Sequence, residues 1–79
     1  MYAQVFELDA EQGERLNGSI CELLRALRTE DGFCGGLSLV LRETGEMILL
    51  VFWETENEAT HPLLPAGVTA KIWEVSARA

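Results

Sequence analysis

The longest apolar run in the chain is Met47 to Trp53, seven residues bounded by Glu46 and Glu54. A half-buried strand would alternate apolar and polar residues, and a surface helix would keep a polar stripe. The run shows neither pattern, so we predict a central strand that is covered on both faces. A chain of 79 residues can cover one face of a sheet with helix and has little left for the other. The pattern therefore predicts that a partner supplies the second cover.

A first strand and one amphipathic helix are predicted ahead of this run. Residues 2–8 carry apolar side chains on both faces of an extended chain, which favours a strand of mixed burial. Asp9 is a suitable N-cap for the next element, and Gln12 stands where a capping box places its second partner. Apolar residues then recur in one helical stripe, formed by Leu16, Ile20, Leu23, Leu24 and Leu27. We predict a single helix between Asp9 and Thr29, in which Gly18 costs up to about 1 kcal/mol relative to alanine.

A hairpin is predicted next. Residues 32–36 are rich in glycine and indicate a turn that leads into a strand. In that strand Leu37, Leu39 and Leu41 alternate with other residues, so one face is strongly apolar. Residues 43–46 then form a short loop into the long apolar run, which makes these two strands antiparallel neighbours.

The segment after the apolar run has a different character. Residues 56–67 contain Pro62 and Pro65, which allow at most one short helical turn before Pro62. Residues 68–75 alternate again and predict a last strand. Twelve residues of helix would be too short to return along a full strand. Either the crossover is largely extended, or the last strand joins a neighbouring chain.

These elements follow the order strand, helix, strand, strand, short crossover, strand, without an internal repeat or linker. One domain, residues 1–79, accounts for the whole sequence. The arrangement that connects such elements without crossing loops is ferredoxin-like. We therefore predict an α+β fold, βαββ(α)β, with an antiparallel four-stranded sheet.

Composition narrows the classes of partner. The net charge is −7, from 13 acidic and 6 basic residues, which argues against nucleic acid and anionic membrane surfaces. No basic region followed by an apolar core begins the sequence, and no apolar run approaches the roughly 20 residues that span a bilayer. We expect a cytoplasmic protein. The two cysteines fit neither a disulfide framework nor a CxxC metal pair, so we expect reduced thiols and no metal site or cofactor.

Three stretches carry a resemblance to a known family. They are a Gly-Phe-x-Gly-Gly turn at residues 32–36, an Arg-Glu-Thr-Gly hairpin at residues 42–45, and a strand that closes on Trp-Glu-Thr-Glu at residues 53–56. Together they resemble the antibiotic biosynthesis monooxygenase-like domain. The resemblance implies a dimeric α/β barrel, in which two ferredoxin-like sheets pack face to face and a ligand site lies between each sheet and its helices.

The sequence also departs from that family. Its members usually have a full second helix where this chain has two prolines. Members that degrade haem use an Asn on the first strand, the Trp that closes the third strand and a His on the second helix. Trp53 matches the Trp, whereas the first strand here has Gln4 and no Asn. His61 precedes Pro62 in a segment that is not expected to form a full helix, so the resemblance carries over Trp53 alone.

Four residues are candidates for a ligand or catalytic site. Tyr2, Gln4 and Trp53 could contact an aromatic ligand, although large aromatic residues more often pack a core, which favours a structural role for Trp53. His61 titrates nearest neutrality and is the default general base, but an exposed loop histidine is the commoner case. The sequence shows no assembled acid–base or nucleophile group.

Other reactive groups have plainer explanations. Cys34 could be a reactive thiol, but no basic residue is close in sequence, and Cys21 lies beside the helical stripe as a packing residue. Glu54, Glu56 and Glu58 could share one face of an extended chain and bind a hard cation, although a solvated charged segment is commoner. Arg42 and Lys71 could steer an anionic ligand or form surface ion pairs.

Two hypotheses of function follow. The first is a non-catalytic homodimeric module that binds a small apolar or aromatic ligand, or only self-associates. The second is a cofactor-independent monooxygenase that acts on an aromatic or polyketide-like compound. The sequence favours the first. In both cases the partner is a second copy of the chain, and we expect the following residues in the interface: Val40, Met47, Leu49, Val51 and Trp53.

Overall fold

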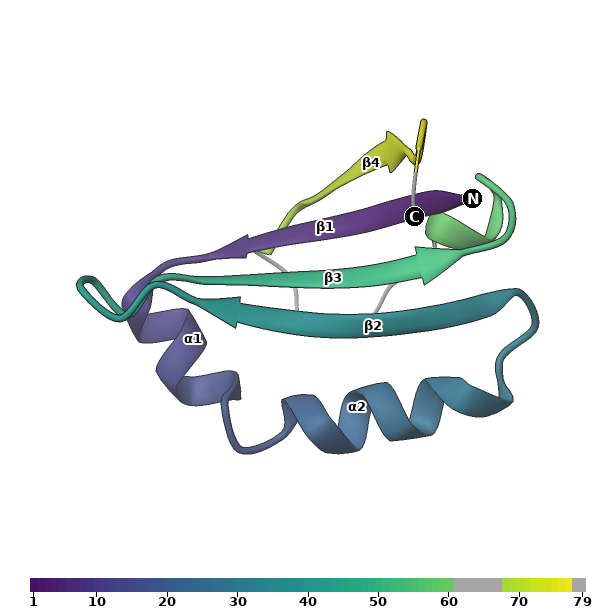
Figure 1. Cartoon of the computed structure of the whole chain (residues 1–79). Helices are drawn as coiled ribbons and strands as arrows, with labels where there is room; N and C mark the ends of the chain where they lie inside the picture. Colours follow the sequence, from purple (N-terminus) through teal and green to yellow (C-terminus); the bar gives the residue numbers. More distant parts are fainter. Residues whose placement is uncertain (61–67, 78–79) are drawn as a thin grey trace.

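A four-stranded antiparallel sheet carries two short helices on one of its faces (Figure 1). The computed structural model describes residues 1–60 and 68–77. Its elements are β1 Tyr2–Leu8, α1 Ala10–Leu16, α2 Ile20–Ala26, the 3-10 turn η1 Leu27–Thr29, β2 Phe33–Val40, β3 Met47–Trp53, the 3-10 turn η2 Glu58–Thr60 and β4 Ala70–Glu74. The strand order is β2-β3-β1-β4, so the long apolar run is a central strand. The predicted ferredoxin-like α+β fold is confirmed.

The last strand lies within the same chain. β4 pairs with β1, with Tyr2 opposite Glu74 and Phe6 opposite Ala70. In this structure β4 therefore completes the sheet of its own chain. The expected short helical turn is η2, and the remaining crossover residues, 61–67, lie outside the described part of the chain.

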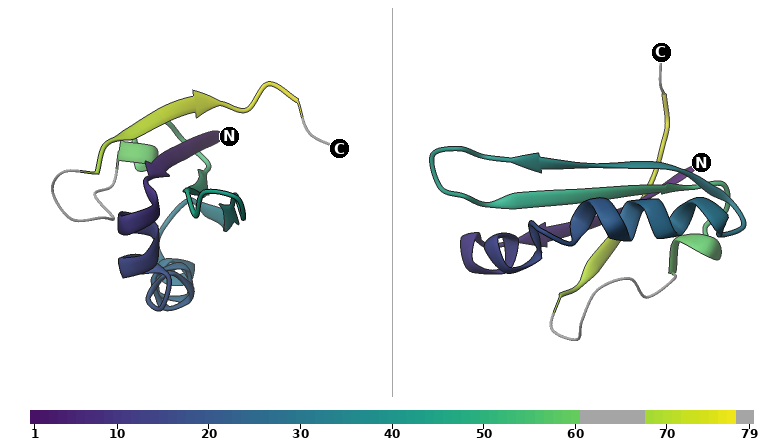
Figure 2. Two further views of the ribbon diagram at one scale, coloured as in Figure 1. Left: turned by 90° about the vertical axis from the view of Figure 1, so that its left-hand side faces the viewer. Right: turned by 90° about the horizontal axis from the view of Figure 1, so that it is seen from below.

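The predicted single helix is wrong, because it is broken after Leu16 (Figure 2). The backbone N–H of Ser19 donates to the carbonyl of Leu16 at 2.9 Å, and the Ser19 hydroxyl donates to the same oxygen at 3.1 Å. These bonds close a turn over Asn17 and Gly18, two residues that favour helix weakly. The start of the helix is as predicted: Gln12 N–H donates to Asp9 at 2.8 Å, and Asp9 N–H donates back to the Gln12 side chain at 3.1 Å.

The glycine-rich segment is mostly strand rather than turn. β2 begins at Phe33 and pairs with β3 from its first residue, with a bulge between Phe33 and Gly35. Gly35 has a φ of +130°, a backbone conformation that residues with a side chain rarely adopt. The bulge sets the start of β2 beside the end of β3, where the candidate site lies.

The sheet has two unlike faces. On the face toward the helices, the side chains of Leu49 and Val51 are 0% exposed and that of Trp53 is 1% exposed. Phe6 and Leu8 from β1 join them, together with Ile20 and Leu27 from the helical layer. This face is the core of the single chain.

The interface residues we expected therefore need revision. Met47, Leu49, Val51 and Trp53 all lie in that core, so their side chains have no surface to offer a partner. Val40 is 53% exposed at the far end of β2. The run has no polar residue to mark its outer face, so the sequence did not show which half of it turns inward.

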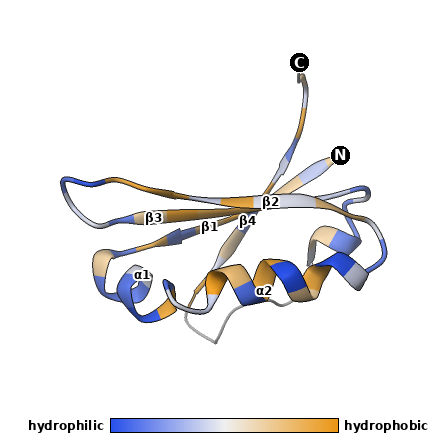
Figure 3. Cartoon of the chain, turned by 60° about the horizontal axis from the view of Figure 1, so that its bottom comes forward, coloured by the Kyte–Doolittle hydropathy of each residue, from blue (hydrophilic) through white to orange (hydrophobic). Residues whose placement is uncertain are grey.

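The opposite face, which we call the open face, is apolar and uncovered in the described part of the chain (Figure 3). Its apolar residues are Ala3, Val5, Leu37, Leu39, Ile48, Leu50, Phe52 and Trp73, and the charged residues Glu7 and Lys71 lie among them. Leu39 is 52% exposed and Trp73 is 59% exposed. No helix among the described residues is long and apolar enough to cross a membrane.

Candidate functional site

A buried hydrogen bond joins the two central strands at one end of the sheet. The indole N–H of Trp53 donates to the side-chain oxygen of Gln4 at 2.9 Å, and both residues are almost fully buried. Tyr2 pairs with Trp53 across the strands and is half-buried. A buried amide is tolerated when it is hydrogen-bonded, and here it fixes the orientation of the indole ring. The predicted trio of Tyr2, Gln4 and Trp53 is therefore brought together, with Trp53 in the core.

Phe33 connects this buried pair to the surface. Its ring meets the indole of Trp53 edge to face, with ring centroids 5.9 Å apart and an interplanar angle of 77°. Such aromatic pairs are favourable beyond the area that they bury. Sequence reasoning missed Phe33 as a site residue, although the Gly-Phe-x-Gly-Gly motif contains it.

Phe33 forms one wall of a groove between α2 and β2, which we call the α2–β2 groove. Its volume is about 400 Å³. The residues that line it are Cys21, Leu24, Arg25, Arg28, Phe33, Gly35 and Gly36. It lies on the helical side of the sheet, where an apolar wall and a few polar groups meet, as ligand sites commonly do.

Two glycines give the groove its shape. A Cβ on Gly36 would come within 2.6 Å of Leu24 Cδ2, so glycine allows α2 to pack directly on β2. Gly35 lines the groove with its backbone, since it is opposite Phe52 and a Cβ there would point to the open face. The groove is thus closed at Gly36.

A second hollow of about 540 Å³ lies at the opposite end of the sheet, beside the β2–β3 loop. Leu39, Leu41 and Ile48 line it, together with the acidic residues Glu7, Asp9 and Glu46. Tyr2, Gln4 and Trp53 line neither hollow, but Phe33, which packs against Trp53, lines the α2–β2 groove. We therefore place the candidate site in the α2–β2 groove.

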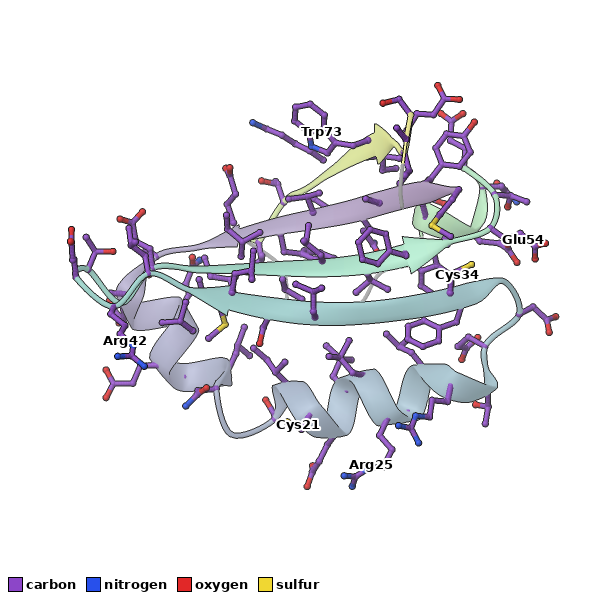
Figure 4. The ribbon with its side chains drawn as sticks, viewed as in Figure 1. Cys21, Arg25, Cys34, Arg42, Glu54 and Trp73 are labelled. Atoms are coloured by element: carbon purple, nitrogen blue, oxygen red, sulfur yellow. The ribbon has the colours of Figure 1, made fainter. Side chains whose placement is uncertain are left out.

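The two cysteines differ in position (Figure 4). Cys21 is exposed on α2 and lines the groove. Cys34 is exposed in the bulge, and its thiol donates to the carbonyl of Gly32 at 3.4 Å. Both are free thiols. His61 lies outside the described residues.

The remaining charged candidates do not assemble into a site. The chain turns after Trp53 rather than staying extended, and the Glu58 carboxylate accepts from the Thr55 hydroxyl at 2.9 Å. The common face that Glu54, Glu56 and Glu58 could have shared on an extended chain therefore does not form. Within residues 1–60 and 68–77, no group of three or more His, Cys, Asp or Glu side chains could hold a metal ion. Arg42 and Lys71 are exposed on separate elements.

The fold is ferredoxin-like α+β, with a four-stranded antiparallel sheet and helices on one face (Figure 1). Among solved structures, the chain is similar to the haem degrader MhuD of Mycobacterium tuberculosis, in a structure with two haems bound in its active site. The superposition covers 100% of this chain and 99% of that chain, with a TM-score of 0.71 and 16% sequence identity. No family model and no curated protein matches the sequence.

Proposed function

We propose that this chain is a homodimeric, non-catalytic module that binds a planar apolar small molecule in the α2–β2 groove. One observation carries the proposal: Phe33 stands in the wall of the groove and is held from behind by the hydrogen-bonded Trp53. A rigid aromatic wall offers large contact area at little entropic cost, because its orientation is fixed before the ligand arrives.

The open face supports the homodimer. Leu37 and Leu39 on β2, Ile48 on β3 and Trp73 on β4 are each at least 38% exposed on this face. Contiguous apolar surface on this scale marks an interaction site in a soluble protein. A second copy of the same sheet offers a surface of matching character, and two such faces packed together would form a closed barrel. The proposed interface uses the open-face residues in place of those we expected from sequence.

Haem is a reasonable probe because a structural neighbour binds it, but the described groove does not form a haem site. Cys21 is the single residue among those lining the groove that belongs to a type that ligates haem iron, and it stands on the exposed side of α2. We therefore treat haem as one test compound and not as an assigned ligand.

A cofactor-independent monooxygenase that acts on an aromatic or polyketide-like compound is the second candidate. The likeness of the whole chain to a degrading enzyme favours it, as does the placement of Trp53 and Gln4 behind the groove. A measurement of oxygen consumption in the presence of the ligand distinguishes the two candidate functions. The module we propose binds a compound that elutes unchanged, whereas the enzyme consumes oxygen in proportion to the ligand.

A thermal-shift screen of planar aromatic compounds and haem tests ligand binding, since a ligand selective for the native state raises the melting temperature. Cys21→Trp fills the groove from an exposed helix position and is expected to abolish the shift. Glu22→Trp adds the same ring to the next residue, which does not line the groove, and is expected to keep it. A shift that survives in C21W would place the ligand elsewhere.

A further inference from the structure

Two arginines gather at the α2–β2 groove of an acidic chain. The sequence has 6 basic residues against 13 acidic ones, and Arg25 and Arg28 both line this one groove. They are three residues apart on α2 and η1, a spacing that places two side chains side by side on a helical surface. In Figure 4, Arg25 extends away from the sheet, so it stands at the mouth of the groove rather than on its floor.

Among the described residues, no carboxylate forms an ion pair with either of these arginines. The residues that line the groove include no Asp or Glu. In the described part of the chain, neither Arg25 nor Arg28 forms a side-chain hydrogen bond or ion pair. By contrast, the hollow at the far end of the sheet is lined by three acids. The lining of the α2–β2 groove thus combines two guanidinium groups with an aromatic wall and contains no carboxylate.

We infer that the ligand of the α2–β2 groove is an aromatic acid: its carboxylate binds Arg25 and Arg28, and its ring packs against Phe33 and Leu24. This inference rests on the proposed function and specifies its ligand class. A guanidinium group donates two parallel hydrogen bonds to a carboxylate, which fixes the orientation of the ligand as well as its charge. The groove has a volume of about 400 Å³ beside Phe33, which gives room for the ring.

The position of the arginines favours a carboxylate over a phosphate. Arg25 is in the last turn of α2, where the helix dipole places partial negative charge. That partial negative charge repels a dianionic phosphate more strongly than a monoanionic carboxylate. The groove also has an apolar wall that suits a ring.

Binding of a matched pair of compounds tests the inference. The probes are 2-naphthoate and 2-naphthamide, which share ring and size and differ in charge. We expect the wild-type protein to bind the acid at least about tenfold more tightly than the amide by titration calorimetry. The variant R25Q/R28Q is expected to lose this preference and keep its affinity for the amide. Arg42→Gln, which removes an equal charge outside the groove, is expected to retain the preference.

The outcomes separate the inference from the proposed function. Equal binding of acid and amide by the wild-type protein would overturn the inference and leave the aromatic groove standing. A preference that survives in R25Q/R28Q would also overturn it, because the charge would then be recognised elsewhere. Failure of both compounds to bind would count against the proposed function itself. Circular dichroism checks that the variants fold, as expected for two exposed helix residues.

Discussion

The two faces of β3 differ greatly in burial, although every residue of the strand is apolar. Leu49 and Ile48 are neighbours in one apolar run, yet Leu49 is 0% exposed beneath the helices and Ile48 is 38% exposed on the open face. The inner face is covered within one chain, because residues of α1, α2 and β1 pack against it. The outer face has apolar side chains and no partner among the described residues. The same strand therefore supplies one face that is buried within the chain and one apolar face that is exposed, and only the fold tells them apart.

The largest effect is expected on the inner face. Leu49→Asp places a carboxylate in a core position that has no cation beside it, and an unpaired buried charge costs several kcal/mol. A domain of this size has little stability to spare. We expect L49D to be unfolded by circular dichroism at 25 °C. A cooperative melting transition like that of the wild type would contradict the placement of Leu49 in the core.

The same substitution one residue earlier is expected to act differently. Ile48→Asp places its carboxylate on the open face, where it meets water in the monomer and would be buried in the dimer. We expect I48D to keep its secondary structure and to dissociate, with a dissociation constant raised at least about a hundredfold. Sedimentation velocity over a range of concentrations measures this. Unfolding of I48D would mean that the two faces are not separable.

A smaller effect is expected from the bond behind the groove. Trp53→Phe removes the indole N–H that donates to Gln4 and leaves most of the ring area in place. The loss of one buried hydrogen bond partner costs about 1–3 kcal/mol, which urea denaturation resolves. Trp73→Phe is the matched control on the open face, since Trp73 is 59% exposed, and it is expected to leave monomer stability nearly unchanged.

The smallest effect concerns the helical layer. Gly18 lies in the break between α1 and α2, and its Cβ would meet no atom within 4 Å in the described structure. Gly18→Ala is expected to raise stability by up to about 1 kcal/mol, because alanine reduces the freedom of the unfolded chain. Gly35→Ala is expected to lower stability, because Gly35 has a positive φ that alanine rarely adopts. A stabilised G35A would show that the bulge does not have this backbone.

Local patterns were enough to predict most of the fold. The capping box at Asp9, the antiparallel hairpin and the central place of Met47 to Trp53 each depend on residues close together in sequence. The helix break was missed because the apolar stripe runs on past Gly18 as if the helix were continuous. Propensity at two residues decided the geometry there, while the hydrophobic pattern did not change.

The site was harder to predict because it is assembled from distant parts of the chain. Gln4 and Trp53 were both named from sequence, but the bond between them joins residues 49 positions apart. Phe33 acquires its role from contact with Trp53, and Arg28 from the packing of η1 beside β2. None of these contacts leaves a periodic signal in the sequence. Which face of β3 turns inward is likewise set by the register with β1 and by the helices.

The mass of the wild-type chain in solution tests the central claim most directly, namely that a second copy covers the open face. Light scattering coupled to size exclusion, at micromolar concentration, measures that mass without a label or a ligand. We expect twice the mass of the single chain for the wild-type protein, and the single-chain mass for I48D. A monodisperse monomer of the wild-type protein would contradict it.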